Sequence, residues 1–309
     1  MYPVKSDEAS AYSTNAAAKT AADELLEAMK ASQELIKNNS ALQADVDNLV
    51  AKMDAVTASL EGTIQQLETL IEEAKALYDE AYMPVSDESK KLITEADDDD
   101  DEHNQFSSNA KMPENTSNWG YYRNMIDNDP ATYFITIHST SYATAVPPTG
   151  LHYLQVDLKE NPVDAFIFHY VPNTTFPQFS WKDMTISASN DGETWDDITE
   201  LKGLAADTYD SPCVRMWKSY RHVRFSVSAT GNNLIKGGGP CFCIGEFQMY
   251  PVKVSANAPY ATSTDVKAKT DAVVEDLPGM MAKFNDKSAT SDEINAFSAK
   301  VAALKEALK

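Results

Sequence analysis

The chain has 309 residues, of which 43% are hydrophobic, enough to bury cores in two or three domains. Its 26 basic residues are outnumbered by 47 acidic ones. The net charge of -21 argues against nucleic acid and against an anionic membrane surface, because both are bound through clustered Lys and Arg. No window approaches the roughly 18 apolar residues of a membrane span. The first ten residues hold no apolar signal core, so either the chain is cytosolic or a targeting segment has been removed.

Charge and aromatic content divide the chain into three parts. Residues 1–102 carry 8 basic and 24 acidic side chains, residues 103–252 carry 10 and 15, and residues 253–309 carry 8 and 8. All Trp, His and Cys residues lie in the middle part. The division predicts a helical arm, then an aromatic, turn-rich domain, then C-terminal helices.

The N-terminal arm is predicted to hold two long helices, over residues 8–37 and 40–84. In the second, apolar residues recur at steps of three and four, which is typical of a heptad seam. The seam consists of Leu42, Val46, Leu49, Met53, Val56, Leu60, Ile64, Leu67, Ile71, Ala74 and Tyr78. Ser40 and Gln43 are a candidate capping box at its start, and Pro84 is a candidate stop.

The end of this arm is expected to be a short helix over residues 86–96, followed by an acidic run over 97–102. Six consecutive acids cannot all face one ion, and adjacent like charges repel. The run is therefore interpreted as a solvated linker.

Two further helices are predicted at the C-terminal end. One covers residues 264–277 and ends at Pro278. The other begins at a capping box formed by Thr290 and Glu293. Its apolar stripe consists of Ile294, Phe297, Val301, Leu304 and Leu308. Because such a stripe needs a partner, we expect the two arms to pack in one bundle, with the middle domain inserted between them.

The middle part, residues 103–252, shows short runs rich in Val, Ile, Phe, Tyr and Thr, separated by turn residues. This spacing predicts a β-sandwich or jelly roll, and the chain as a whole is predicted to be α+β. Cys213, Cys241 and Cys243 are too few for a disulfide scaffold. Three thiols are preferred to a bridge from Cys213 to either of the other two.

Five phrases of this part resemble, in order, one known family. They are NMIDNDPATYF at 124–134, YLQVDL at 153–158, SNDGETW at 189–195, RHVRF at 221–225 and IGEFQMY at 244–250. Together they resemble the coagulation-factor type C, or discoidin, domain, whose bacterial relatives include the family 32 carbohydrate-binding modules. Asn128 and Lys159 stand where the family has, usually or often, Gly. Asn tolerates a left-handed turn, so the first departure is mild.

The resemblance implies an eight-stranded antiparallel jelly roll that binds a glycan without cleaving it. It would be carried on a helical stalk outside the cytoplasm, at a bacterial cell surface or secreted. A second hypothesis is a protein–protein or adhesion module whose helical arms form the interface, with a protein partner or by self-association. A third is a fragment of a larger glycan-processing assembly. Catalysis is not expected, because no zinc-helix spacing of His and no Gly-x-Ser-x-Gly phrase occurs.

The resemblance also implies a structural Ca²⁺ beside the early acidic turn. Asp127 and Thr132 would provide side-chain oxygens, Asn124 and Asp129 backbone or side-chain oxygens, and Glu246 would close the shell from the last strand. Ca²⁺ takes about six to eight oxygens, which this set can supply together with carbonyls. The alternative is an Asx turn, in which Asp127 accepts hydrogen bonds from its own loop.

The ligand site of the resembled family lies on loops at one end of the sandwich. A sugar needs a flat apolar surface and several planar hydrogen-bonding groups. The candidate ligand-binding residues are His138, Tyr142, Asn173, Phe176, Phe179, Arg215, Asn232 and Asn233. Phe176 is expected to be exposed, and Trp181 is expected in the core. Val171-Pro172 replaces the family's basic contact in the second loop, which argues against galactose-type specificity.

Overall fold

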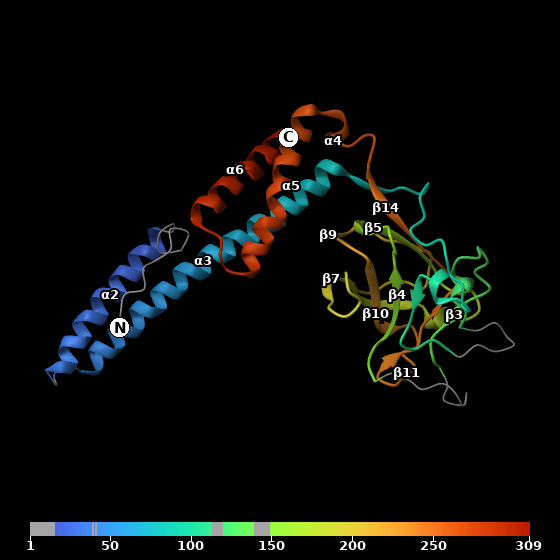
Figure 1. Ribbon diagram of the computed structural model, residues 1–309, viewed down its shortest axis with the longest axis horizontal. Helices are drawn as coiled ribbons and strands as arrows, with labels where there is room; N and C mark the ends of the chain where they lie inside the picture. The colour runs from blue at the N-terminus through green and yellow to red at the C-terminus, as the bar shows by residue number, and fades with distance from the viewer. Residues whose placement is uncertain (1–15, 39, 41, 113–119, 139–148) are drawn as a thin grey trace. The chain divides into compact units, whose positions relative to one another are not determined.

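The computed structural model describes residues 16–38, 40, 42–112, 120–138 and 149–309. It divides into two compact units (Figure 1). The helical unit comprises residues up to Met83 together with Val254–Lys309, and the β unit comprises Pro84–Lys253. Residues 84–102 therefore belong to the β unit, whereas the sequence pattern grouped them with the helical arm.

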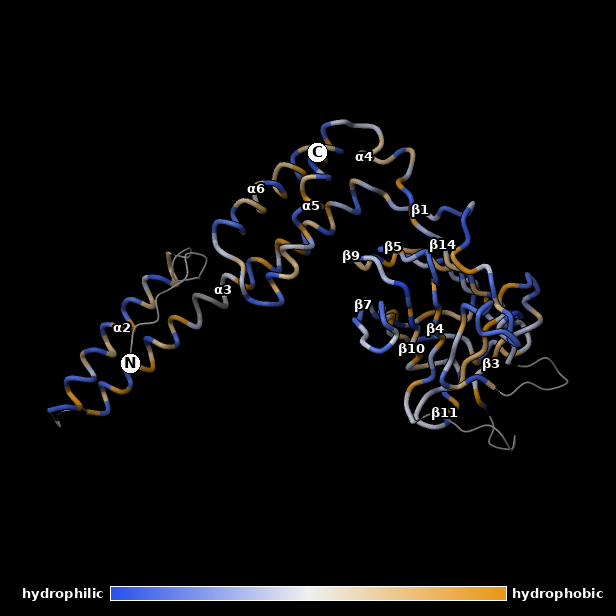
Figure 2. The backbone as a smooth tube through the Cα atoms, in the orientation of Figure 1, coloured by the Kyte–Doolittle hydropathy of each residue, from blue (hydrophilic) through white to orange (hydrophobic). Residues whose placement is uncertain are grey.

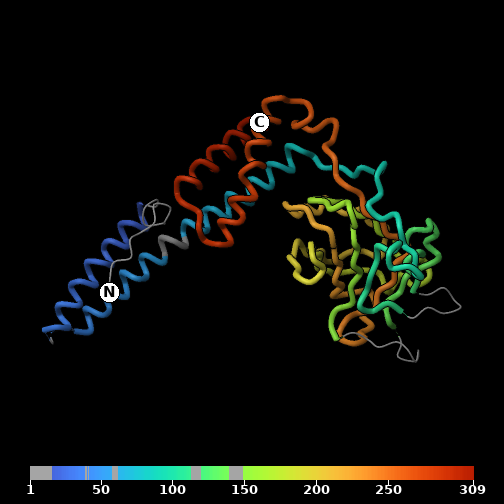
Figure 3. Tube along the Cα trace, viewed as in Figure 1, coloured from blue at the N-terminus to red at the C-terminus, as the bar shows by residue number. Residues whose placement is uncertain are grey.

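The helical unit is organised around one long helix. Its helices are α2 (Ala16–Lys37), α3 (Gln43–Tyr82), α4 (Pro259–Thr262), α5 (Thr264–Asn285) and α6 (Ser291–Ala307). α2 lies along the N-terminal half of α3, and α5 and α6 lie along its C-terminal half (Figure 3). The shared core of α3, α5 and α6 consists of Leu67, Ile71, Ala74, Val273, Leu277, Phe297, Val301 and Leu304. Apolar stripes far apart in sequence thus bury one another.

Two predicted helix starts can be compared with the structure. α6 begins as predicted: the amide of Glu293 donates to Thr290 Oγ1 at 3.3 Å, and the amide of Thr290 donates to Glu293 Oε2 at 3.0 Å. The capping box predicted at Ser40 is wrong. α3 begins after Leu42, whose amide donates to Asp45 Oδ2 at 2.8 Å.

α5 does not end at Pro278 but continues through it to Asn285. A proline inside a helix removes one backbone hydrogen bond and crowds the preceding turn. Leu277 and Met280, on either side of this position, are both buried. Burial of apolar side chains over two further turns offsets the free-energy cost of the proline. This burial depends on tertiary contacts and is not visible in the sequence alone.

The short helix predicted over residues 86–96 is also wrong. This segment contains the strand β1 (Pro84–Ser86) and then runs as an irregular edge. Two side-chain amides bind its backbone. Gln105 accepts from Thr94 at 2.7 Å and donates to the carbonyl of Leu92 at 2.8 Å, and Gln248 accepts from Ile93 at 3.1 Å. These bonds replace those of a helix.

The acidic run is largely exposed, as expected of a solvated segment, but Asp98 departs from this prediction. Asp98 is fully buried at its side chain and forms an ion pair with Lys111 at 2.9 Å. Its carboxylate also accepts from the amides of Tyr122 at 2.8 Å and Arg123 at 3.2 Å. A buried charge is stable only when paired and hydrogen-bonded. Asp98 therefore fastens the run to the 3₁₀ turn η2 (Tyr122–Met125).

The β unit is a sandwich of two five-stranded sheets. The first contains β1, β14 (Glu246–Val254), β5 (Val163–Val171), β8 (Tyr209–Asp210) and β9 (Val214–Tyr220). The second contains β2 (Phe106–Ser107), β4 (His152–Asp157), β10 (His222–Thr230), β6 (Trp181–Ser189) and β7 (Asp196–Leu201). Two small ladders pair β3 (Phe134–Ile135) with β13 (Cys243–Ile244), and β11 (Ile235–Lys236) with β12 (Gly239–Pro240).

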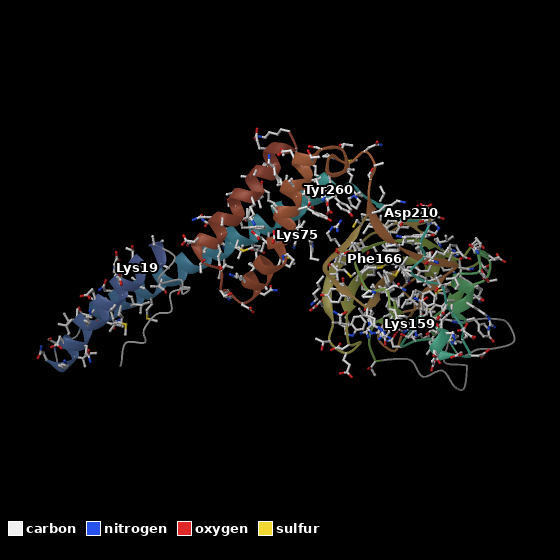
Figure 4. All side chains as sticks on the ribbon, turned by 45° about the horizontal axis from the view of Figure 1, so that its top comes forward. Lys19, Lys75, Lys159, Phe166, Asp210 and Tyr260 are labelled. Atoms are coloured by element: carbon white, nitrogen blue, oxygen red, sulfur yellow. The ribbon has the colours of Figure 1, made fainter. Side chains whose placement is uncertain are left out.

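Aromatic rings fill the space between the sheets. Trp181 is fully buried, as predicted, and stacks on Tyr170 with ring centroids 4.7 Å apart. Phe166, labelled in Figure 4, is also fully buried. Trp195 lies outside this core. It is half-buried under the guanidinium of Arg224, 3.7 Å from the ring centroid.

Both departures from the family pattern adopt the conformation that glycine would have. Asn128 has φ 64° and Lys159 has φ 54°, both left-handed. The turn at Lys159 is supported by Asp157, which accepts from its amide at 2.8 Å. The same carboxylate binds Arg221 through two bonds of 2.8 and 2.9 Å. Asp157 thus accepts from a loop amide and also holds an arginine.

Candidate functional site

The acidic turn before β3 collects oxygen atoms around one hydroxyl group. Thr132 Oγ1 lies 2.8 Å from Asp127 Oδ2, 2.9 Å from the carbonyl of Asp129 and 3.4 Å from the carbonyl of Asn124. Asp127 Oδ1 accepts from the amide of Asp129 at 2.9 Å. The turn is thus an Asx turn, and it also places several oxygen atoms that can act as metal ligands close together.

Glu246, the first residue of β14, brings a second carboxylate to this turn. Burial and the neighbouring carboxylate of Asp127 raise the pKa of Glu246 to about 7. Its Oε1 atom is buried and has no hydrogen-bond partner among the residues that the structure describes. Two carboxyl groups in this position repel each other unless one is protonated or a cation lies beside them.

The donor chemistry of this turn fits a hard cation. Asp127, Glu246 and Thr132 contribute side-chain oxygens, and carbonyls of the turn complete an all-oxygen set of the kind that Ca²⁺ prefers. One carboxylate oxygen of Asp129, Oδ1, is already engaged within the turn, because it accepts from the amide of Ala131 at 3.0 Å. Within the described part of the chain, no three acidic, His or Cys side chains form a metal cluster, so carbonyls would be needed.

Asn173 does not offer its amide to a ligand, contrary to its prediction. It is buried, and its Nδ2 donates to the carbonyls of Pro130 at 2.9 Å and Thr132 at 3.2 Å. Its Oδ1 accepts from the amides of Thr175 and Phe176, both at 3.0 Å. Asn173 therefore ties the acidic turn to the loop between β5 and β6 and positions Phe176.

Phe176 lies at the surface end of a small aromatic cluster. Its ring meets Tyr133 edge-on at 5.4 Å and lies 6.4 Å from Phe179. Phe176 and Tyr133 are half-buried, whereas Phe179 is buried and cannot serve as a contact surface. The prediction that Phe176 is exposed is thus correct only for part of its ring.

The loop after β10 reaches the same end of the sandwich. A Cβ built on Gly231 would lie 2.9 Å from the carbonyl of Gln178, so the two loops touch. Asn232 is exposed. Asn233 accepts from the amide of Thr230 at 2.9 Å and adopts φ 49°, so it shapes the turn. Of the two predicted asparagines, Asn232 is the one placed to meet a ligand.

The remaining predicted ligand residues are more scattered. His138 is half-buried close to β11, and burial lowers its pKa. Arg215 lies on β9 opposite Ala165, near the start of β5, whereas Phe176 follows the end of β5. The structure therefore separates Arg215 from the others by most of a strand. Tyr142 lies outside the described residues.

A groove on the outer face of β5 and β14 was not anticipated from the sequence. It has a volume of about 310 Å³, and its polar lining includes His169, Gln248, Tyr250 and Lys91. In the register of this pair, Gln248 lies opposite His169 and Tyr250 lies opposite Ile167. His169 Nδ1 is 2.6 Å from Asp210 Oδ1. Alternation along each strand places these side chains together, but only once the register is known.

The two-sheet sandwich with a candidate site on its end loops can be compared with known protein families. The model described as "F5/8 type C domain" matches residues 103–236. The matched segment resembles a discoidin-like F5/8 type C domain and spans less than half of the chain. The match leaves outside the helical unit and also residues 84–102 and 237–253 of the β unit. A comparison with curated proteins finds no match.

Several solved structures are similar to the β unit. One is a family 32 module of Clostridium perfringens in complex with GalNAc-β-1,3-galactose. It has 15% identity, covers 47% of this chain and 94% of that one, and gives a TM-score of 0.34. Another is the family 32 module of C. perfringens NanJ in complex with galactose, with 16% identity, 47% and 91% coverage and a TM-score of 0.32. A putative chitobiase fragment from Bacteroides thetaiotaomicron has 16% identity, 48% and 87% coverage and a TM-score of 0.35.

Proposed function

We propose that the β unit binds a carbohydrate, without cleaving it, at the loop end that carries Phe176. The observation that carries this proposal is the half-exposed pair of Phe176 and Tyr133, held in place by the hydrogen bonds of Asn173. A fixed aromatic edge offers the C–H face of a sugar a surface that loses little entropy on binding. The resemblance of the matched segment to the F5/8 type C domain supports a binding role.

Polar groups around this pair supply the hydrogen bonds that a sugar needs. Gln178 and Asn232 are exposed on the two touching loops, and His138 lies on the segment after β3. One shallow aromatic contact with a few hydrogen bonds corresponds to a free energy of about 4–8 kcal/mol, or an affinity between roughly micromolar and millimolar.

A structural Ca²⁺ in the acidic turn is part of the same proposal. Asp127 and Glu246 would hold it together with Thr132 and carbonyls of the turn. The ion would neutralise two neighbouring carboxylates and connect the first loop to the last strand. Its role is to stiffen the turn to which Asn173 is bonded, and so to hold the ligand loop.

The carboxylates at this end support binding rather than hydrolysis. A glycosidase needs two carboxyl groups on either side of the bound sugar. Asp127 is instead hydrogen-bonded inside its own turn, with Glu246 beside it. We place the protein outside the cytoplasm, at a cell surface or secreted, because a glycan-binding role is exercised there. None of the described helices is long and apolar enough to cross a membrane.

The test is a broad glycan array, followed by titration calorimetry of each hit. Galactose and GalNAc-β-1,3-galactose are natural first probes, since similar modules were solved with them. Phe176→Ala should weaken binding at least tenfold. Tyr250→Ala removes an aromatic ring from the outer-face groove and should leave the affinity unchanged. The reverse result would move the site to that groove, and an array without hits would reject carbohydrate binding.

A second candidate function is a protein–protein module whose interface is the helical unit. The observation that favours it is a set of exposed apolar side chains on α2 and α3, each between 37% and 69% accessible. The two functions are compatible, because they use different units of the chain.

A further inference from the structure

The two halves of α3 are covered unequally. In the C-terminal half, α5 and α6 bury Leu67, Ile71 and Ala74 to 3% exposure or less. In the N-terminal half, α2 is the one described helix that packs on α3, and large apolar side chains of the described residues remain accessible on both helices. They are Leu26 (48%), Met29 (37%) and Ile36 (66%) on α2, Leu42 (69%) at the N-cap of α3, and Val46 (51%), Val50 (50%) and Met53 (53%) on α3. Figure 2 shows hydrophobic and hydrophilic positions alternating along both helices.

The six of these side chains that lie within the helices share one face of the α2–α3 hairpin. At 3.6 residues per turn, the three on α3 fall within about 60° of arc, and the three on α2 fall within about 80°. Each helix has a seam that faces the other helix; on α3 it includes the half-buried Leu49 and Val56. In both helices, the exposed apolar arc is rotated away from this seam in the same direction. Because the helices are antiparallel, equal rotation brings both arcs to one face, which we call the apolar face.

The opposite face of the hairpin is polar and internally paired. Lys52 Nζ lies 2.5 Å from Glu24 Oε2 across the two helices. The groove on this side is lined by Asp23, Glu24, Glu27, Ala28, Ala31, Asn48 and Lys52. Among the residues that the structure describes, nothing covers the apolar face as α5 and α6 cover the same seam further along α3.

We propose that a second copy of this chain covers the apolar face, so that two α2–α3 hairpins form an antiparallel four-helix bundle. α2 has 22 residues and is about 33 Å long; with two helices side by side, the face measures about 650 Å². A stable interface of standard size buries about 800 Å² per partner. The face is thus of the size that a dimer uses.

The charges along the edge of α2 are complementary to themselves. Lys19, Asp23, Lys30 and Glu34 follow one edge of α2, and each also has an ion-pair partner three or four residues away in the same helix. A twofold axis that crosses α2 between Leu26 and Glu27 places Lys19 opposite the partner's Glu34 and Asp23 opposite the partner's Lys30. One axis satisfies both pairs, as an isologous interface requires.

The same axis places apolar residues at the centre. The Lys52–Glu24 ion pair sets the register of α2 against α3, so Val50 lies level with Leu26. Both are about half exposed, and both would meet their own copies on the axis. In this antiparallel overlap, the α5–α6 half of each copy extends beyond the α2–α3 turn of the other copy. The two hairpins can therefore pack together without meeting α5 or α6.

Sedimentation equilibrium of the full chain tests the proposal. The parent chain should be dimeric, and Leu26→Glu combined with Val50→Glu should raise the dimer Kd at least tenfold, because each introduced charge faces its own copy. Ala44→Glu with Ala51→Glu is the matched control, since both alanines are exposed on the other side of α3. The control should leave the Kd unchanged, and circular dichroism should show equal helicity in all variants.

Charge exchange tests the register. Lys19→Glu or Glu34→Lys alone should weaken the dimer about threefold or more, while the double variant, or an equimolar mixture of the two single variants, should restore it. The proposal would be overturned if the chain stayed monomeric over a 100-fold range of protein concentration. It would also be overturned if the dimer Kd did not change when Leu26 and Val50 are substituted. Failure of the exchange to restore binding would overturn the twofold pairing. If removal of residues 1–15 turned a monomer into a dimer, the face would belong to the chain's own N-terminal segment instead.

Discussion

The carboxyl group of Glu246 lies beside that of Asp127, so that the last long strand of the sandwich meets its first acidic turn. Burial and this neighbour raise the pKa of Glu246 to about 7, and its Oε1 has no hydrogen-bond partner within the described part of the chain. Two neighbouring carboxyl groups raise the free energy of the folded state at neutral pH unless a cation compensates them.

Calcium should therefore stabilise the β unit. We expect Ca²⁺ to raise its melting temperature, and chelator to lower it, by stabilising the folded state through binding. Asp127→Ala should abolish the calcium effect in calorimetry. Asp207→Asn, at an exposed position of the same unit, removes one carboxylate elsewhere and should retain it. Absence of heat at millimolar Ca²⁺ would leave the turn as an Asx turn alone.

Asn173 should matter for stability before it matters for binding. Asn173→Ala removes a buried amide that bonds the acidic turn and the Phe176 loop. Loss of such buried hydrogen bonds costs about 1–3 kcal/mol of unfolding free energy. Urea unfolding of the β unit measures this, with the exposed neighbour Thr174→Ala as a control of near-zero effect. Equal midpoints for the two variants would contradict the positioning role.

His152 should make the β unit sensitive to acid. It is fully buried, with Nε2 2.8 Å from the carbonyl of Lys236 and Nδ1 3.0 Å from Thr136 Oγ1. Burial lowers its pKa below the ordinary value of 6.5. The folded state thus binds a proton less readily than the unfolded chain, so the contribution to stability is complete above pH 6.5 and is lost as the pH falls through the folded pKa.

The measurement is the unfolding free energy between pH 7.5 and 5 for the parent chain and for His152→Gln. The variant is expected to be less stable at neutral pH, but its stability should fall less steeply with acid. The contrast in slope isolates His152 from other titrating groups. Parallel curves would show that His152 does not titrate with unfolding.

The two units should unfold separately when their cores are damaged separately. Phe297 is buried in the helical unit and Phe247 in the β unit, each to 1% exposure. Phe to Ala in a core costs about 3–5 kcal/mol. Phe297→Ala should lower the midpoint temperature of the unfolding transition that is followed by helical circular dichroism. Phe247→Ala should lower the midpoint of the transition that is followed by Trp fluorescence, since all Trp residues lie in the β unit. One shared transition in both variants would contradict this division.

Patterns of short range predicted several features correctly. The stripe of α6 and its Thr290 capping box needed only local spacing, and the family phrases identified the sandwich and the left-handed turn at Asn128. Trp181 was placed in the core because a strand follows it directly. These features depend on neighbouring residues, whose chemistry the sequence displays side by side.

Tertiary structure alone decided the remainder. Asp98 belongs to an acidic run but is buried, because Lys111 and two backbone amides surround it. Asn173 is of a residue type that often binds ligands, but its amide donates to carbonyls far away in the sequence. The helix α5 continues through Pro278 because the apolar side chains on either side are buried. In each case the free energy comes from partners far away in the chain. A polar or helix-breaking residue reveals its local cost in the sequence, whereas the contacts that offset it exist only in the folded molecule.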